Sequence, residues 1–334
     1  MNSFTDRIYV AGHRTMEGSA IVRQLLRVGH PKSHIITSDD TPWALNHPMA
    51  FREFLQRTQP QQMYLPLSGI RAAIDLKHPT PSELNRAITA PLHALQSAAD
   101  CGVKKVLLLL DNEVYPAQAL QPLAEEDLLG GPLRPQSEMA SLSMIMAMKY
   151  LELSTSSLDG AQLDCRCAVR GSVYGMGDDY GRHTQQPVAA LIRQVDLARE
   201  SGLEEIRIAA RADDHVDVLF VDDLAEASMY LMEQPRRAFD AATAGHYRHV
   251  NIGLGHPVSM QRLVDAVVHS CGYPGTYVFS EEPGLWSRAR LMDCNRLNRM
   301  DWHALIDIDQ GVDFAFLDYR LHHARRESTA RILM

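Results

Sequence analysis

Residues 7–26 read RIYVAGHRTMEGSAIVRQLL, and this stretch decides the fold. A short apolar run enters a turn that contains glycine, and an apolar pattern with helical spacing follows directly. A glycine turn between a strand and a helix is typical of dinucleotide-binding folds, where glycines make the tight turn and let the helix pack against the strand. Gly12 and Gly18 fill the first and last places of a GxxGxxG pattern, whereas Thr15 takes the middle place.

The residues of this turn are the candidates for cofactor binding. A helix that starts here directs free N–H groups and the positive end of its dipole toward a phosphate. The candidates on the turn are Gly12, Arg14, Thr15, Met16 and Gly18. A β-branched side chain at the middle place crowds the approach of a phosphate, so a turn kept only for packing is an open alternative.

A second cofactor contact is expected at the end of the next apolar run, which reads TSDD. Asp39 or Asp40 would accept hydrogen bonds from an adenosine ribose, and neither suits a 2′-phosphate. NAD is therefore favoured over NADP if a cofactor binds, although the cofactor itself stays unknown. The alternative is an acidic turn exposed to solvent.

Outward from the turn, short apolar runs alternate with amphipathic helical patterns. The run KKVLLLLD at 104–111 is typical of a central parallel strand buried on both faces. The alternation predicts an α/β fold, a Rossmann-type doubly wound parallel sheet with a smaller C-terminal α/β substrate lobe. We expect the first domain over 1–175, with returning segments from about 205–255, and the smaller lobe mostly over 176–334.

Composition excludes several classes of protein. A net charge of −8 argues against a broad basic surface, so we expect no nucleic acid and no membrane as partners. No apolar run approaches the roughly 20 residues that span a bilayer, and the first twelve residues show no secretory signal. Five scattered cysteines fit a reduced, cytoplasmic protein, and no metal-ligand spacing is evident.

An ordered series of motifs carries a resemblance that covers about residues 7 to 320. The series runs through AGHRTMEGSAIVRQL, KKVLLLLDNEVYP, LAEEDLLGGPLRP, VYG, VDD, NIGLG and GYPGTYVFS. In this order the chain resembles GDP-L-fucose synthase, an extended short-chain dehydrogenase/reductase of the NAD-dependent epimerase/dehydratase type. That resemblance implies a fold that epimerises a GDP-4-keto-6-deoxy sugar and then reduces its ketone with NADPH.

The resemblance also shows which catalytic places have changed. The family's active-site Tyr and Lys, spaced as Tyr-x-x-x-Lys, fall on Ala140 and Met144. Its carbonyl-orienting Ser falls on Asp111, and its epimerase Cys and His fall on Glu113 and Gln186. A ketone reductase needs a proton donor at the carbonyl oxygen, and neither Ala nor Met supplies one. Conventional reductase activity is therefore not expected.

Other residues leave room for binding or for a different reaction. Glu113 with His183 would serve as acid and base for an epimerisation or isomerisation without hydride transfer. The alternative is that Glu113 ends a strand beside a cation and that His183 lies on a surface loop. Side chains expected to hold a nucleotide diphosphate or its sugar are Arg170, Ser172, Arg288 and Arg290. Each arginine is also explained by a surface or interface charge.

The helix expected around residues 137–153 is rich in methionine. A stripe at helical spacing comprises Met139, Leu142, Met146 and Tyr150. Such a stripe indicates a core or dimer face, and in the family the equivalent helix joins two subunits. We expect a homodimer through this helix, with an active paralogue or another protein as further possible partners and a nucleotide-sugar as possible ligand.

Three hypotheses follow from these residues. The favoured one is a pseudoenzyme that binds a nucleotide or a partner without redox turnover. The second is an enzyme that acts on a nucleotide-sugar without hydride transfer and uses Glu113. The third, less favoured, is an NAD(P)-dependent nucleotide-sugar epimerase/reductase that uses other residues.

Overall fold

The computed structural model describes residues 5–37, 47–67, 80–156, 163–181, 184, 186–244, 247–280 and 290–332. The chain divides into two compact units. Unit 1 comprises residues 1–170, 224–252 and 293–302, and unit 2 comprises residues 171–223, 253–292 and 303–334. The chain therefore passes between the units several times.

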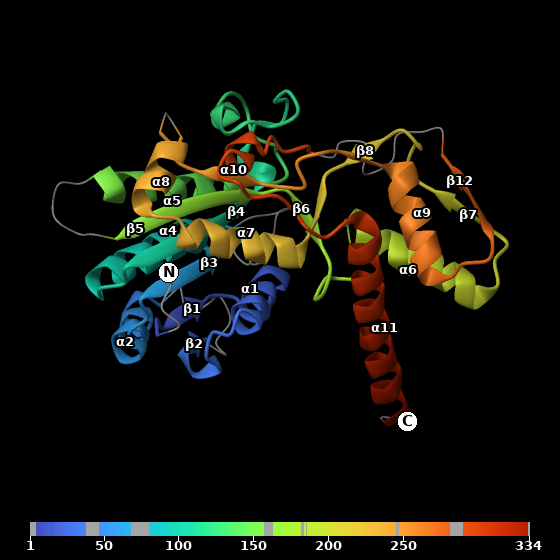
Figure 1. The fold of residues 1–334 in the computed structure, drawn as a ribbon, viewed down its shortest axis with the longest axis horizontal. Coiled ribbons are helices and arrows are strands. Elements are labelled where there is room, and N and C mark those ends of the chain that lie inside the picture. Colours follow the sequence, from blue (N-terminus) through green and yellow to red (C-terminus); the bar gives the residue numbers. More distant parts are fainter. Residues whose placement is uncertain are drawn as a thin grey trace. The chain divides into compact units, whose positions relative to one another are not determined.

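Unit 1 is built on a six-stranded sheet in the order β10-β5-β4-β3-β1-β2, and neighbouring strands run parallel (Figure 1). The strands are β1 Ile8–Val10, β2 Ile35–Ile36, β3 Gln62–Pro66, β4 Lys105–Asp111, β5 Asp164–Arg170 and β10 Val250–Ile252. The central strand β4 is buried from Val106 to Asp111, because helices cover both faces of a doubly wound sheet. The predicted Rossmann-type α/β fold is confirmed.

Helices surround this sheet. They are α1 Met16–Arg27, α2 Pro48–Thr58, α4 Pro81–Asp100, α5 Glu138–Ser156, α8 Arg236–Ala242, α10 Asn295–Asn298 and α7 Val221–Glu233, of which unit 1 holds Leu224 onward. Helix α4 packs against both α2 and α5. Its first turn carries a capping box, in which Thr80 and Glu83 satisfy each other's backbone N–H groups.

A buried arginine anchors the end of α7 to the sheet. Arg166 lies in β5 with none of its surface exposed. Its guanidinium donates to Asp164 at 2.7 Å, to the Gln234 carbonyl at 2.7 Å and to the Leu231 carbonyl. The cation meets the last carbonyl groups of the helix, where the dipole is negative, so this charge is both paired and hydrogen-bonded inside the protein.

The described residues of unit 2 form three short strand pairs and three helices that lie wholly within the unit. Its strands are β6 Ser172–Tyr174, β7 Glu205–Ile208, β8 His215–Val216, β9 Val218–Phe220, β11 Val258–Ser259 and β12 Thr276–Phe279. Strands β6 and β9 pair in parallel, as do β7 and β12, whereas β8 and β11 are antiparallel. The helices are α6 Pro187–Ser201, α9 Met260–Cys271 and α11 Ile308–Ile332.

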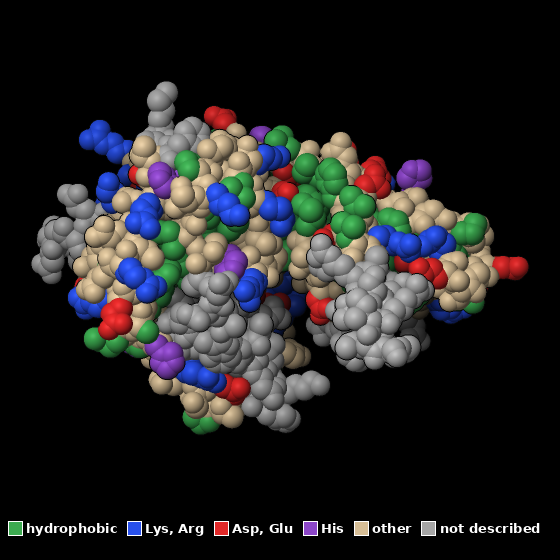
Figure 2. All heavy atoms as spheres, turned by 90° about the horizontal axis from the view of Figure 1, so that it is seen from below, with side chains coloured by type: hydrophobic (Ala, Val, Ile, Leu, Met, Phe, Trp, Pro, Cys, Tyr) green, Lys and Arg blue, Asp and Glu red, His purple; other side chains and the backbone are tan. Residues whose placement is uncertain are grey.

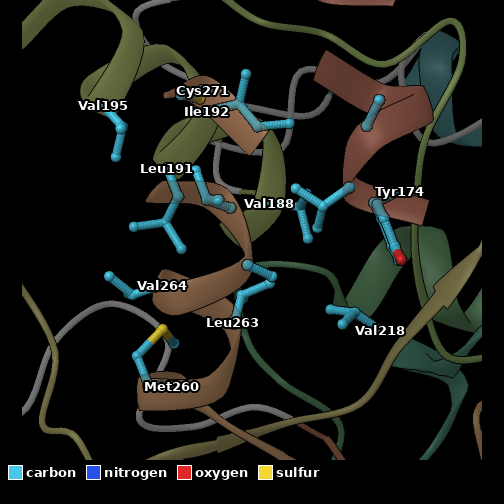
Figure 3. Packing of buried hydrophobic residues seen from close by; sticks show 14 of the residues in the cluster. Tyr174, Val188, Leu191, Ile192, Val195, Val218, Met260, Leu263, Val264 and Cys271 are labelled. Carbon is cyan, nitrogen blue, oxygen red and sulfur yellow. The ribbon is translucent and has the colours of Figure 1, made fainter. Parts of the chain in front are cut away.

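The core of unit 2 forms where α6 meets α9. Figure 3 shows Val188 and Leu191 of α6 beside Leu263 and Val264 of α9. All four side chains are fully buried. Leu191 lies one turn after Val188, and Leu263 and Val264 lie one turn after the buried Met260, so burial of this apolar face is the main reason the two helices pack.

The division differs from the expected one at residues 205–223. These residues were expected to return to the first domain, but the pairing of β7 with β12 and of β8 with β11 ties them into unit 2. Helix α2 begins at Pro48, whose fixed φ suits a first helical position.

The cysteines are all free thiols. Cys165 and Cys167 lie in β5, Cys271 ends α9, Cys294 precedes α10 and Cys101 follows α4. Only Cys101 is partly exposed. Burial raises the pKa of the Cys271 thiol to about 12 and that of Cys167 further, so both stay protonated near neutral pH.

The surface carries charges of both signs. Figure 2 shows basic, acidic and apolar side chains mixed over one face of the molecule. Within the described ranges, no helix combines the length and the apolar character needed to cross a membrane.

Candidate functional site

The glycine turn connects β1 to α1 and has the expected strand–turn–helix geometry. Gly12 has a left-handed φ of 60°, which a residue without a Cβ adopts at no steric cost. A Cβ built on Gly18 would lie 2.1 Å from the Gly12 carbonyl oxygen, so glycine is required where the helix approaches the turn. The two glycines of the pattern therefore keep their structural roles.

The middle place of the turn is filled by a side chain that bonds to the turn itself. Thr15 caps α1: its Oγ1 accepts a hydrogen bond from the Gly18 N–H at 3.2 Å. The same hydroxyl donates to the Gly12 carbonyl at 2.8 Å. Met16 is the first helical residue, and Arg14 is exposed beside it.

A buried ion pair lies next to this turn. Glu17, in the first turn of α1, is 4% exposed. Its Oε1 lies 2.8 Å from Nη2 of Arg170, the last residue of β5. In the sheet Arg170 lies opposite Asp111, the last residue of β4. Ligands of open α/β sheets bind at the carboxyl ends of the strands, and this pair stands at that edge.

Glu113 lies two residues after the end of β4 and is held by four side chains. Its Oε2 accepts from Ser137 at 2.6 Å, and its Oε1 lies 3.3 Å from Nη1 of Arg134. The Ser141 hydroxyl donates to the Glu113 carbonyl at 2.9 Å, and Asp111 accepts from the Glu113 N–H at 3.0 Å. We call Glu113, Ser137, Arg134 and Ser141 the Glu113 cluster. It fastens the end of β4 to the start of α5.

The two positions on which the resemblance places the family's Tyr and Lys lie in unit 1. Ala140 and Met144 in α5 are each 1% exposed. Neither has a group that donates a proton, and both pack as core residues. Of the predicted stripe on this helix, Leu142 and Met146 are 40% and 49% exposed, whereas Met139 and Tyr150 are half-buried. The stripe therefore faces outward from unit 1.

The remaining predicted site residues are spread over the chain. Gln186 precedes α6 and Ser172 begins β6, both in unit 2. Arg290 is buried in unit 2. The predictions for Asp39, Asp40, His183 and Arg288 fall outside the described residues. In unit 1 the structure brings Glu17, Arg170 and the ends of β4 and β5 together.

Sequence reasoning missed a buried polar network in unit 1. The Tyr115 hydroxyl donates to Oδ1 of Asn251 at 2.5 Å and lies 2.8 Å from Nε2 of His249. The Asn251 N–H donates to Glu125, and Arg296 donates to the His249 carbonyl at 2.6 Å. Tyr115 and Asn251 belong to the VYP and NIG motifs, which marked ancestry in the sequence without indicating that they meet.

The pKa shifts in this network favour a structural role over a role in acid–base chemistry. Burial, with the positive charges of Arg296 and Lys149 nearby, lowers the pKa of His249 to about 3. Burial also raises the pKa of Tyr115, so neither group titrates near neutral pH. The network locks β10 to the segment after β4.

A hollow of about 550 Å³ lies within unit 2. Its lining combines apolar side chains with His215, His256, Ser259, Arg262 and Asp307. The Arg262 guanidinium is bound by Asp309 at 2.8 Å, and the Ser259 hydroxyl caps α9. Across the described part of the chain, no group of three or more His, Cys, Asp or Glu side chains is placed to hold a metal ion.

Comparison with known proteins agrees with this architecture. The chain is 26% identical to GDP-L-fucose synthase from Escherichia coli (strain K12) over 306 residues, which cover 92% of this chain and 94% of that protein. It is 26% identical over 311 residues to probable GDP-L-fucose synthase 1 of Oryza sativa subsp. japonica, covering 92% and 89% of the two chains.

Solved structures show the same fold. A GDP-D-glycero-L-gluco-heptose synthase from Campylobacter jejuni superposes with a TM-score of 0.82 at 19% identity, covering 96% of this chain and all of that one (100%). A GDP-L-fucose synthetase from Naegleria fowleri gives a TM-score of 0.81 at 14% identity, covering 96% and 95%. The model of the NAD dependent epimerase/dehydratase family matches residues 8–253. The chain therefore belongs to the NAD dependent epimerase/dehydratase family.

Proposed function

We propose that this chain is a family member without hydride-transfer activity. It serves as a homodimer that binds a nucleotide or a protein partner. The Glu113 cluster is the observation that carries the proposal. At the end of β4, where the resemblance places a Ser and a Cys, the carboxylate of Glu113 is engaged by Ser137 at 2.6 Å and by Arg134 at 3.3 Å. These groups join elements of the fold and leave no hydroxyl or thiol poised for a substrate carbonyl.

Helix α5 supports the same reading. Ketone reduction requires an acid within hydrogen-bond reach of the developing oxyanion, and such an acid contributes about 10²–10⁴-fold in rate. The matching positions, Ala140 and Met144, are buried and carry no ionisable group. Asp111 accepts a backbone N–H and, when ionised, would repel negative charge on a carbonyl oxygen.

The outward face of α5 supports the homodimer. Leu142, Met146 and Leu153 recur at helical spacing, and Leu153 is 70% exposed. Large apolar side chains gathered on one helix face mark a protein contact. The neighbouring helix α4 is fixed to α5 by the hydrogen bond from Tyr150 to Gln96 at 2.6 Å, so both helices present one surface.

Hydride transfer is tested directly. The purified protein is incubated with a GDP-4-keto-6-deoxy sugar and NADH or NADPH, and nicotinamide absorbance is followed beside the Escherichia coli relative as a positive control. We expect no oxidation above buffer. Steady oxidation in proportion to enzyme would overturn the proposal.

The same mixtures test chemistry without redox. Solvent deuterium that enters the keto-sugar, and no longer enters with Glu113→Gln, would replace the proposal with epimerisation by Glu113. Absence of exchange in both proteins is the expected result. It agrees with a carboxylate that is held by Ser137 and Arg134.

A further inference from the structure

We propose that Thr15 and the Glu17–Arg170 ion pair close the phosphate-binding turn against a dinucleotide. Replacing Thr15 by Gly and Glu17 by Val should then restore dinucleotide binding. The inference does not depend on the proposed function, because a protein without a general acid can still bind NAD or NADP. It concerns a different part of unit 1 from the Glu113 cluster.

Thr15 contributes the first part of this closure. A pyrophosphate can approach the backbone of such a turn only where the middle place lacks a side chain. The Thr15 hydroxyl is held on both sides, since it donates to the Gly12 carbonyl at 2.8 Å and accepts from the Gly18 N–H at 3.2 Å. The side chain is therefore fixed inside the turn, and it consumes one of the N–H groups at the start of α1.

Glu17 contributes the second part. The start of a helix stabilises one nearby anion through its dipole and free N–H groups. Here the chain supplies that anion, because the Glu17 carboxylate lies in the first turn of α1. A pyrophosphate brought to this place would meet a buried carboxylate whose charge Arg170 only partly offsets, and the remaining repulsion is strengthened because little water screens it.

Arg170 holds this carboxylate in position. The side chains of Arg170 and Glu17 are 12% and 5% exposed, and their charged atoms lie 2.8 Å apart. A buried pair resists separation, because removing one partner leaves the other charge uncompensated. The pair joins α1 to the carboxyl end of β5, which is the edge where Rossmann folds place their ligands. The dinucleotide implied by the family therefore does not fit the residues present.

The test is a fluorescence titration of the full chain with NADH and with NADPH. We compare the wild type, Thr15→Gly/Glu17→Val and a matched control, Thr80→Gly/Glu83→Val, which changes the same residue types at the start of α4. The wild type and the control should show no saturable binding. The first double variant should bind at least about tenfold more tightly, because the crowding side chain and the like charge are gone while Arg170 remains.

Two outcomes would overturn the proposal. Micromolar binding by the wild type would show that the turn is open. A double variant that melts like the wild type by circular dichroism and yet binds no better would show that Thr15 and Glu17 are not the barrier. If the double variant fails to fold, Thr15→Gly alone, which keeps the ion pair, must still bind more tightly than the wild type.

Discussion

At the scale of single residues, the unusual feature is a carboxylate that serves the fold. Glu113 is 9% exposed, and its acceptor oxygens meet one hydroxyl and one guanidinium. An alanine at this place would leave Ser137 and Arg134 without that partner at the junction of β4 and α5. Buried donors without acceptors cost more than the bond itself contributes.

We therefore expect Glu113→Ala to lower the free energy of unfolding by about 2 kcal/mol, with Arg134 discounted because it is partly solvated. Urea unfolding followed by circular dichroism measures the change. Glu53→Ala, an exposed glutamate on α2, is the matched control and should stay within about 0.5 kcal/mol of the wild type. Equal losses in both variants would mean that the cluster contributes nothing specific.

The sequence predicted the glycine turn between β1 and α1 better than it predicted the contacts of the candidate site. Gly12 and Gly18 could be placed from their spacing, since glycine adopts the left-handed φ of the first without steric cost and only glycine fits the close contact of the second. The pairing of Glu17 with Arg170 could not be predicted, because those residues lie far apart in the chain and meet only once β5 has joined the sheet. The catalytic and binding roles given to individual residues stay predictions.

At the scale of elements, the two faces of α5 have different roles: one packs in the core of unit 1 and the other is exposed. The inward face carries Ala140 and Met144, and the outward face carries Leu142 and Met146. If the outward face joins two copies, a charge placed there must be buried without a partner in the dimer. A charge on an exposed helix elsewhere has no such cost.

We expect the wild type to sediment as a dimer and Met146→Glu to sediment as a monomer at low micromolar concentration. Met49→Glu on α2 is the control, since Met49 is 71% exposed on another helix of unit 1. Analytical ultracentrifugation separates the outcomes. A monomeric wild type, or a dimer that survives Met146→Glu alone, would exclude this face as the contact.

The elements themselves were predictable to different degrees. Strand β4 coincides with an apolar run, because a strand buried on both faces is mostly apolar. Strand β5 is less obvious in the sequence, since the buried Arg166 interrupts it. The pairs β7–β12 and β8–β11 had no comparable signal. Their strands are two to four residues long, and packing between distant segments decides which strands pair.

At the scale of the whole molecule, one buried group in each unit makes stability depend on pH, and these two groups act in opposite directions. In unit 1 the pKa of His249 is about 3 when folded and 6.5 when exposed, so the unfolded chain binds the proton first. Stability from this residue is present above pH 6.5 and is lost as pH falls. In unit 2 burial raises the pKa of Asp217 to about 6 from 3.8, so stability rises as pH falls through that range.

Between about pH 7 and about pH 5, the lowered pKa of His249 should reduce the free energy of unfolding by about 2 kcal/mol. Over the same range the raised pKa of Asp217 should increase it by about 1 kcal/mol. Urea unfolding at both pH values is compared among the wild type, His249→Gln and Asp217→Asn. Relative to the wild type, the first variant should lose less stability on acidification and the second should lose more. Identical pH slopes in all three proteins would show that neither group carries the dependence.

Each unit contains a buried thiol whose alkylation rate reports how often that unit opens. Cys167 lies in the central sheet of unit 1 and Cys271 in the core of unit 2, and both are buried. A protonated, buried thiol reacts with an alkylating reagent only after its surroundings open. Mass spectrometry of peptides alkylated in the native state therefore reports the opening of each unit separately, without a mutation.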